Sequence, residues 1–461
     1  MPINSDYSNE NLSQDPIHGY IPFTVDSERT LIDAPWVQRL RQIHQLQTAW
    51  LVYPTAEHTR FQHCIGAMHL AGRMARRLYP SLADVCRDEL PSIGYVTSLL
   101  RVAALLHDVG HGPFGHFFDS HFLSEYGLTH ERLGARIIVD ELGDLIRGVR
   151  SNPDARLADN ELLDPAQVAL LIVRPTADDP EPPRWLKMLQ SLFSGLYTVD
   201  NMDFVLRDAY MTGFSSRAFD IERLIHFSFF SDRGLTIHLK GHATLARFIA
   251  VRAELFRSVY YHRTVRAIDL TLADLFEESK HLLFPGNPLE NMESYRRFTE
   301  FSLLVDVASW DQSSDSTKQR LAGRWHEFLT RQIPWHLAAE TTAVFERNDR
   351  ELASIFADAT TFEAAVRRLL PATMRDVPMR VDIARHLQIP GSRMPTSGRN
   401  FLYDPQTDRV RGLEEEELFR HIPQSYRICR IYTSESDPNR EIARALDRLV
   451  HPPQLDDLTN M

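Results

Sequence analysis

The sequence predicts a mainly α-helical protein with small β-hairpin elements and an α+β region near its C-terminus. Several long segments repeat apolar residues three and four positions apart, the spacing of one helix face, as in residues 61–78. Short alternating runs bounded by turn residues are fewer and gather after residue 374, as at 401–412. The composition, with 43% hydrophobic and 10% aromatic residues over 461 positions, is typical of a globular chain that can bury a large core.

Four segments follow from these patterns. We expect a disordered lead-in over residues 1–14, a helical core over 15–285, a helical extension over 286–374 and a C-terminal α+β subdomain over 375–461. The elements expected within them, in chain order, are a turn into a short strand at 15–21, helices at 36–52, 61–78, 99–106 and from 130 onward, a surface connection at 151–185 around one short apolar segment at 168–173, a helix at 199–208, a strand at 236–239, a long helix at 243–283, a hairpin at 401–412, a strand at 426–432 and a closing helix at 441–450.

The helix at 99–106 is the element around which the rest is organised. Only Arg101 is polar in this run, so the helix is apolar nearly all round and is expected to be buried. Gly110 and the Gly-Pro pair that follows end it. Its C-terminal end therefore carries a histidine and an aspartate, His107 and Asp108, where the free carbonyls of the helix favour a cation. An ionised carboxylate at such a place is costly unless something positive meets it.

Charge and cysteine content exclude several classes of protein. The net charge of −11 argues against a general nucleic-acid or anionic-membrane surface, although arginine supplies nearly all of the 51 basic residues and suits local phosphate recognition. No apolar run reaches the roughly 18 residues that span a bilayer, and the N-terminus lacks a signal-peptide core. Three scattered cysteines, Cys64, Cys86 and Cys429, indicate a reducing compartment. We therefore expect a cytoplasmic protein with no membrane partner.

Four residues are candidate metal ligands. His63 lies on the inward stripe of the helix at 61–78, and His107 and Asp108 end the buried helix. Asp200 shares a helix face with Phe204, which fits a pocket wall better than a solvated surface. For each histidine alone, simple packing in the core is the commoner explanation. Together, two imidazoles and two carboxylates suit Mn²⁺, Fe²⁺, Ni²⁺ or Zn²⁺ better than Ca²⁺, and open coordination positions would make the site catalytic.

Groups that can move protons and hold phosphates follow in the same region. The possible proton-transfer residues are His111, His116, Asp119, His130 and Glu131. Arg60 and Arg252 could hold phosphates. For Asp203 and Arg207, spaced i,i+4 on one helix, we predict a structural salt bridge. The residues taken by themselves thus predict a metal-dependent phosphohydrolase.

Six motifs in register resemble those of a known family. They are Asp15-Pro16-Ile17-His18-Gly19, Gln38-Arg39-Leu40-Arg41, Arg60-Phe61-Gln62-His63, His107-Asp108 with the six residues after it, His130-Glu131 and Asp203-Phe204-Val205-Leu206-Arg207-Asp208. Their order and spacing resemble the HD-domain deoxynucleoside triphosphate triphosphohydrolases, in the branch whose vertebrate members add a sterile-alpha-motif module that we do not find in this sequence. The resemblance is strong over residues 11–285 and loose beyond.

The resemblance implies a helical HD-domain core that cleaves a dNTP into deoxynucleoside and inorganic triphosphate. It implies one divalent metal per site (Mn, Fe, Ni, Zn or Mg), held by the four ligands above, with further Mg²⁺ carried by the nucleotide. His111, Asp119, His130 and Glu131 would form the catalytic acid–base group, with His130 protonating the leaving 5′ oxygen. The residues that would contact substrate are Gln45, Leu46, Arg60, His116, Phe204, Asp208, Arg252 and Tyr260.

The resemblance also implies regulation by GTP or dNTP activators and a homo-oligomer, a tetramer or a dimer. The residues matching the regulatory nucleotide site are Asp33, Gln38, Arg41, Arg223, His262 and Arg263. The chain departs from the family at four positions. Asn201 and Phe204 stand where the family has a phosphate-binding lysine and a tyrosine, and Ser258 and Asn11 replace basic residues of the regulatory site.

Two other functions remain open at this stage. One is another HD-type phosphohydrolase, such as a nucleotidase, a phosphodiesterase or a nuclease. The other is a nucleotide-sensing assembly protein with little catalysis, against which the full set of metal ligands counts.

Overall fold

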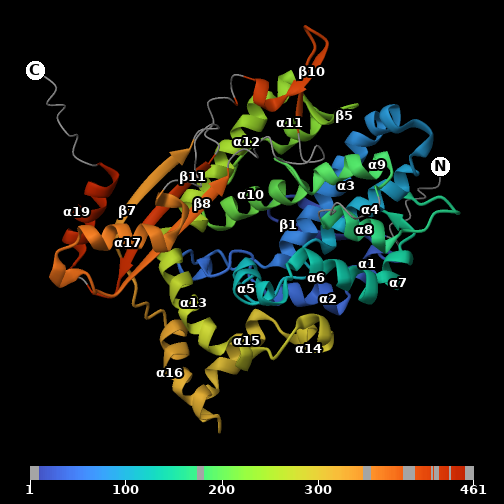
Figure 1. Cartoon of the computed structure of the whole chain (residues 1–461). Coiled ribbons are helices and arrows are strands. Elements are labelled where there is room, and N and C mark those ends of the chain that lie inside the picture. The colour runs from blue at the N-terminus through green and yellow to red at the C-terminus, as the bar shows by residue number, and fades with distance from the viewer. Residues whose placement is uncertain are drawn as a thin grey trace, which may run out of the picture.

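The computed structural model describes residues 10–173, 181–345, 355–387, 400–416, 419, 425–435 and 438–451. Most of the chain folds into one helical body with a single large hydrophobic core, and a small sheet packs on its side (Figure 1). The α-helices of the body are α1 (Glu28–Ile32), α2 (Pro35–Gln38), α3 (Arg60–Cys86), α4 (Ile93–Leu106), α5 (His116–His121), α6 (His130–Arg136), α7 (Gly143–Arg147), α8 (Pro165–Ile172), α9 (Arg184–Leu189), α10 (Val199–Met211), α11 (Ile221–His226), α12 (His242–Leu255), α13 (Arg263–Leu283), α14 (Met292–Arg297), α15 (Glu300–Ala308) and α16 (Ser316–Leu329). The prediction of a mainly helical protein is confirmed.

Three helices form the frame of the site. Helix α4 is buried along almost its whole length, as its apolar sequence predicts, and it packs along α3. Helix α3 begins at a capping box in which Thr59 and Gln62 satisfy each other's backbone amides. Helix α10 begins where Thr198 accepts a hydrogen bond from the amide of Asn201, and it also packs on α3. The three helices bring their histidine- and aspartate-bearing ends together.

Regular structure begins closer to the N-terminus than the sequence predicted. Residues 10–14 belong to strand β1 (Glu10–Asp15), which pairs antiparallel with β2 (Gly19–Thr24), so the prediction of a disordered lead-in was wrong for them. Backbone pairing with β2, rather than any apolar pattern of β1 itself, orders this segment. Residues 1–9 of the predicted lead-in lie outside the described residues.

Three segments of the body differ from expectation. The helix predicted over 36–52 is α2 followed by two 3-10 turns, Arg39–Gln42 and Ala49–Leu51, with a β-bridge from His44 to Thr59 between them. The long helix predicted over 243–283 is two helices, because a π-helical turn over Phe256–Tyr260 ends α12 and His262 then caps the first turn of α13 through its ring. The predicted surface connection at 151–185 contains a hairpin with two residues in each strand, β3 (Ser151–Asn152) and β4 (Ala155–Arg156), which the sequence did not indicate. Its predicted apolar segment lies largely in helix α8, whose apolar face is buried. No helix in the described part of the chain combines the length and apolar character needed to cross a membrane.

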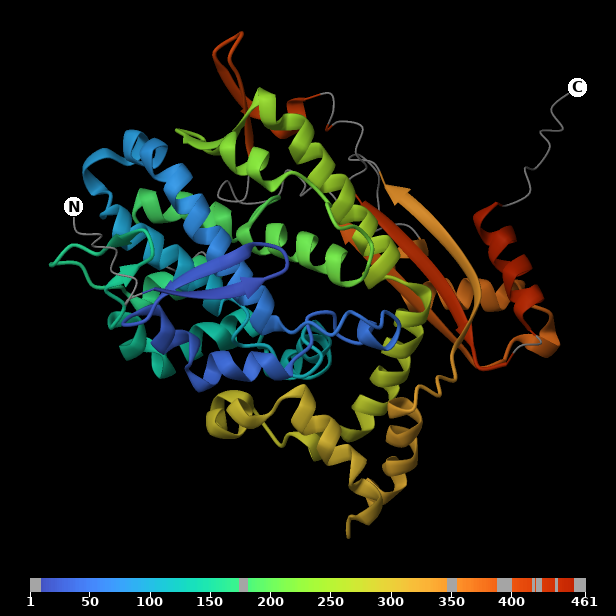
Figure 2. The ribbon, with the colours of Figure 1, turned by 180° about the vertical axis from the view of Figure 1, so that it is seen from behind.

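The C-terminal subdomain begins earlier than residue 375. Strand β7 (His336–Phe345) lies inside the predicted helical extension and pairs with β11 (Ser425–Thr433), which pairs on its other side with β8 (Met379–Leu387). Helices α17 (Ala359–Leu369) and α19 (Asn439–Val450) cover one face of this sheet, and α12 and α13 lie toward its other face (Figure 2). Among the described residues of the extension at 286–374, α-helix therefore ends with α16 and returns at α17.

The predicted hairpin at 401–412 is present but belongs to another sheet. Strands β9 (Phe401–Asp404) and β10 (Arg409–Gly412) form it, and β9 pairs in parallel with β6 (Gly234–His238), which pairs with β5 (Ser228–Ser231). The hairpin thus extends a sheet of the helical body, far from β7, β8 and β11 (Figure 1).

Candidate metal centre and active site

Two histidines and one aspartate meet where α3, α4 and α10 converge. His63 Nε2 lies 3.2 Å from His107 Nε2 and 3.1 Å from Asp200 Oδ1. One nitrogen or oxygen from each of the three residues lies within 4.8 Å of the others, a spacing that can hold a metal ion. His107 Nδ1 donates to the carbonyl of Ala104 at 2.8 Å, which leaves Nε2 as the ligand atom. The donor set fits a divalent transition metal.

Asp108, the fourth predicted ligand, lies beside this group. Its Oδ1 is 3.4 Å from His107 Nε2, and its Oδ2 accepts a hydrogen bond from Arg60 Nη1 at 2.6 Å. Burial by itself would raise the pKa of this carboxyl, but the charges of His107 and Arg60 hold the pKa well below its usual range. Asp108 is therefore a carboxylate that one arginine already neutralises in part.

Electrostatics keeps the other acidic ligand ionised as well. Burial would raise the pKa of Asp200, but its hydrogen bonds with His107 and His63 lower it below the usual range. Burial would likewise lower the pKa of His63, whereas hydrogen bonds with Asp200 and Asp203 raise it to about 10. Binding of a metal at His63 Nε2 would therefore displace a proton.

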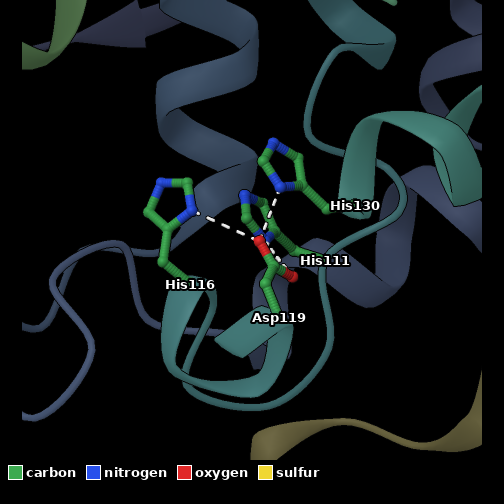
Figure 3. A group of neighbouring side chains, drawn as sticks. All are labelled: His111, His116, Asp119 and His130. Carbon is green, nitrogen blue, oxygen red and sulfur yellow. Dashed lines mark hydrogen bonds and ion pairs between the residues drawn. The ribbon is translucent and has the colours of Figure 1, made fainter. Parts of the chain in front are cut away.

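A second cluster surrounds one carboxylate, Asp119. The rings of His111, His116 and His130 gather around Asp119, as Figure 3 shows. His130 Nδ1 donates to Asp119 Oδ2 at 2.6 Å, and His116 Nδ1 lies 3.3 Å from the same oxygen. His111 is fully buried and stacks on His130 with ring centroids 3.7 Å apart. Burial would raise the pKa of Asp119, but His111 and the other two rings lower it far below its usual range.

A cavity of about 220 Å³ joins the two clusters. Its lining residues from the predicted site are Gln45, Arg60, His107, Asp108, His116, His130, Glu131, Asp200 and Phe204. Metal-ligand candidates therefore form one part of the wall and proton-transfer candidates another. Sequence reasoning missed two lining residues, Ile172 and Phe193, because the end of α8 and the turn before α10 carry no polar motif that could have marked them.

Four predicted substrate contacts lie behind this lining. Leu46 is part of the hydrophobic core, and Arg252 is half-buried, with its pKa lowered by loss of solvent. Asp208 is 1% exposed, and both of its oxygens are occupied: Oδ2 accepts from the Tyr260 hydroxyl at 2.6 Å and Oδ1 pairs with His58 at 2.8 Å. The Tyr260 ring packs against Phe204, which does line the cavity.

The regulatory residues predicted by resemblance divide into two groups. Asp33 and Arg41 line a second cavity of about 340 Å³ with Asn11 and other residues of β1. Gln38 braces it, because its side chain donates to Ile32 O and accepts from Arg41 Nε. The other three are not among its lining residues: Arg223 donates to Lys240 O, His262 caps α13, and Arg263 accepts a hydrogen bond from the Tyr432 hydroxyl at its carbonyl.

The four departures are also placed by the structure. Asn201 does not reach the cavity lining, and its amide donates to Leu196 O. Phe204 lines the cavity, Asn11 lines the second one, and the carbonyl of Ser258 accepts from the Tyr53 hydroxyl.

Comparison with known proteins agrees with this geometry. The HD domain family matches residues 60–172, which include three of the four candidate ligands. The deoxynucleoside triphosphate triphosphohydrolase SAMHD1 of Bos taurus is 25% identical over 96% of this chain and 78% of its own length. The uncharacterized protein YwfO of Bacillus subtilis is 28% identical over 77% of this chain and 78% of its own. A hypothetical protein from Aquifex aeolicus shares the fold, with a TM-score of 0.68 over 95% of this chain and 100% of that one at 21% identity.

The helical fold and the histidine–aspartate centre define a metal-dependent phosphohydrolase of the HD-domain class. Within that class, the chain is similar in sequence to deoxynucleoside triphosphate triphosphohydrolases, at 25% identity to the Bos taurus protein and 28% to the Homo sapiens one. The HD domain accounts for the type of metal centre.

Proposed function

We propose that the protein hydrolyses deoxynucleoside triphosphates to deoxynucleoside and inorganic triphosphate. The observation that carries this proposal is the cavity wall, in which His107 and Asp200 of the metal centre face the same space as His116, His130 and Arg60. A phosphate chain in that space would meet a Lewis acid, a proton donor and a guanidinium together.

His63, His107 and Asp200 would hold the metal, with Asp108 as the fourth ligand. Mixed imidazole and carboxylate donors suit Mn, Fe, Ni, Zn or Mg. When bound, such an ion would polarise a phosphoryl oxygen and lower the pKa of water at the site. Arg60 contributes positive charge at the cavity while its Nη1 remains paired with Asp108.

The remaining residues supply proton transfer and orientation. Release of inorganic triphosphate requires the oxygen of water to join the α-phosphorus while the bond from that phosphorus to the 5′ oxygen breaks. The leaving 5′ oxygen then needs a proton. His130 can donate it from Nε2, because its Nδ1 is held by Asp119, and Glu131 lines the cavity beside it. Gln45 and Phe204 would contact the nucleoside, and Tyr260 would limit the space near the sugar through Phe204.

Nucleotide activation and oligomer formation extend the proposal. The second cavity, with Asp33, Arg41 and Arg29 on its wall, has the charges to bind a guanine base and phosphates of GTP or a dNTP. Arg223, His262 and Arg263 would complete this site from neighbouring subunits of a homotetramer or dimer. The cysteines among the described residues are unpaired and buried, which fits action in the cytoplasm.

One assay tests the proposal. Purified protein is incubated with Mn²⁺ and a dNTP mixture, with and without GTP, and the products are resolved by charge. Inorganic triphosphate with a matching amount of deoxynucleoside is the expected result. Orthophosphate would instead indicate a nucleotidase, a cleaved oligonucleotide would indicate a nuclease, and binding of nucleotide without any product would indicate a sensing protein.

A further inference from the structure

The Asp15-Pro16-Ile17-His18-Gly19 motif forms the turn between β1 and β2. Asp15 Oδ1 accepts hydrogen bonds from the amides of Ile17 and His18, both at 2.9 Å, and Gly19 has a φ of +74°, where a residue without a Cβ is favoured. This geometry turns the His18 side chain inward until it is 2% exposed. The motif therefore delivers one histidine from the N-terminal hairpin into the helical body, and nothing in the proposed reaction has yet used it.

The His18 ring ends on Asp203, a fully buried carboxylate on α10. Asp203 Oδ1 accepts from His18 Nε2 at 2.7 Å, and Asp203 Oδ2 accepts from His63 Nδ1 at 2.8 Å. Arg207 binds both oxygens, at 2.8 and 2.9 Å, which confirms the predicted salt bridge, and its third nitrogen reaches Asp15 Oδ2 at 2.8 Å. The predicted pair is thus part of a network that ends on a metal ligand.

The environment leaves Asp203 little freedom. A Cβ added to Gly66, one turn beyond His63 on α3, would lie 2.0 Å from Asp203 Oδ1, so this glycine makes room for the carboxylate. Arg207 donates to both oxygens of Asp203, so Asp203 is the acceptor and His63 Nδ1 the donor in the hydrogen bond between them. A metal ion would then displace the proton from the other ring nitrogen, Nε2, which lies beside His107 and Asp200.

We propose that Asp203 is the positioning residue for the metal ligand His63, and that His18 and Asp15 of the N-terminal hairpin hold Asp203 in place. The inference rests on the proposed metal centre. A carboxylate behind a ligating histidine fixes its tautomer and ring orientation and raises its basicity. The alternative is that Asp203 and Arg207 only stabilise the fold, in which case metal affinity would not depend on either Asp203 or His18.

Binding of Mn²⁺, followed by electron paramagnetic resonance of the free ion, separates the two explanations without any substrate. Asp203→Asn keeps the shape of the side chain, and Arg207 retains Asp15 as a charged partner. We expect this variant to bind Mn²⁺ about 10–100-fold more weakly than the unmodified protein. Glu28→Gln is the matched control, because it also removes charge from a buried carboxylate paired with an arginine, Arg101, away from the metal ligands. It should bind Mn²⁺ as the unmodified protein does.

His18 provides a second, independent pair of variants. His18→Ala removes the donor to Asp203 Oδ1 and should weaken Mn²⁺ binding, whereas His18→Gln places an amide donor near the position of Nε2 and should restore most of it. An Asp203→Asn protein that folds and binds Mn²⁺ within about twofold of the unmodified protein overturns the proposal. If that variant does not fold, the His18 pair decides, and equal affinities for His18→Ala and the unmodified protein then overturn it.

His63→Ala distinguishes failure of this inference from failure of the metal centre. If the unmodified protein binds no Mn²⁺, or if His63→Ala binds it equally well, the proposed centre itself is wrong. If His63→Ala abolishes binding while folded Asp203→Asn does not affect it, the centre stands and the positioning role alone is rejected.

Discussion

His130→Ala should separate proton transfer from metal binding. His130 lines the cavity and contacts Asp119 and His111, and in the described part of the chain it forms no hydrogen bond or ion pair with His63, His107 or Asp200. The variant should therefore keep its metal. A positioned general acid contributes about 10²–10⁴ to a rate, equivalent to about 2.7–5.4 kcal/mol of activation free energy at about 1.36 kcal/mol per tenfold. We expect kcat for dNTP hydrolysis to fall by that factor.

The fold should survive this change. Asp119 retains His116 and His111 within 3.3 and 3.5 Å, so the free energy of unfolding should fall by no more than the roughly 1.5–3 kcal/mol of one hydrogen bond to a charged group. The assay measures triphosphate release with Mn²⁺, alongside bound metal and thermal unfolding. His281→Ala, a change of the same kind at a largely exposed ring near Glu125, is the control and should retain full activity. Loss of bound metal in folded His130→Ala, or a rate within tenfold of the unmodified protein, would refute the assigned role.

Three further outcomes are expected. Asp108→Ala should abolish hydrolysis and lower the free energy of unfolding by about 3–5 kcal/mol, because it leaves the buried Arg60 without its carboxylate. Product analysis and urea unfolding measure these two effects, and an active variant would show that Asp108 is not part of the metal centre. Tyr260→Ala removes the ring that packs against Phe204 and should open space beside the sugar, which would raise the ratio of GTP to dGTP turnover. An unchanged ratio in a folded variant would contradict the proposed role of Tyr260 in excluding ribonucleotides. Burial by itself would lower the pKa of His44, but the hydrogen bond and charge of Glu300 outweigh burial and raise this pKa above 6.5. The pair therefore stabilises the fold fully below pH 6.5, and its contribution is lost as the pH rises through the raised pKa. His44→Gln should flatten the dependence of unfolding free energy on pH above 6.5, and an unaltered slope would contradict the assignment.

Local patterns in the sequence were sufficient where the physical cause is local. The apolar run of α4 could only be buried, so the position of His107 and Asp108 at the end of a buried helix was predictable. The same holds for the i,i+4 pair on α10 and for the strand, turn and strand of the 401–412 hairpin, since helix periodicity and turn chemistry act within a few residues.

Tertiary structure decided everything that depends on which surfaces meet. Whether His63 and Asp200 face each other depends on the packing of α10 on α3, which no pattern within either helix encodes. Asp203 can form its i,i+4 ion pair with Arg207 in any helix, whereas only the folded chain brings His18 and His63 to the same carboxylate. Strand β9 pairs with β6, about 165 positions earlier in the chain, because an open strand edge accepts any segment of suitable backbone geometry. The sequence alone therefore determined which chemical groups are present and which helix ends carry them. The packing of distant segments determined which of those groups lie close enough to act together.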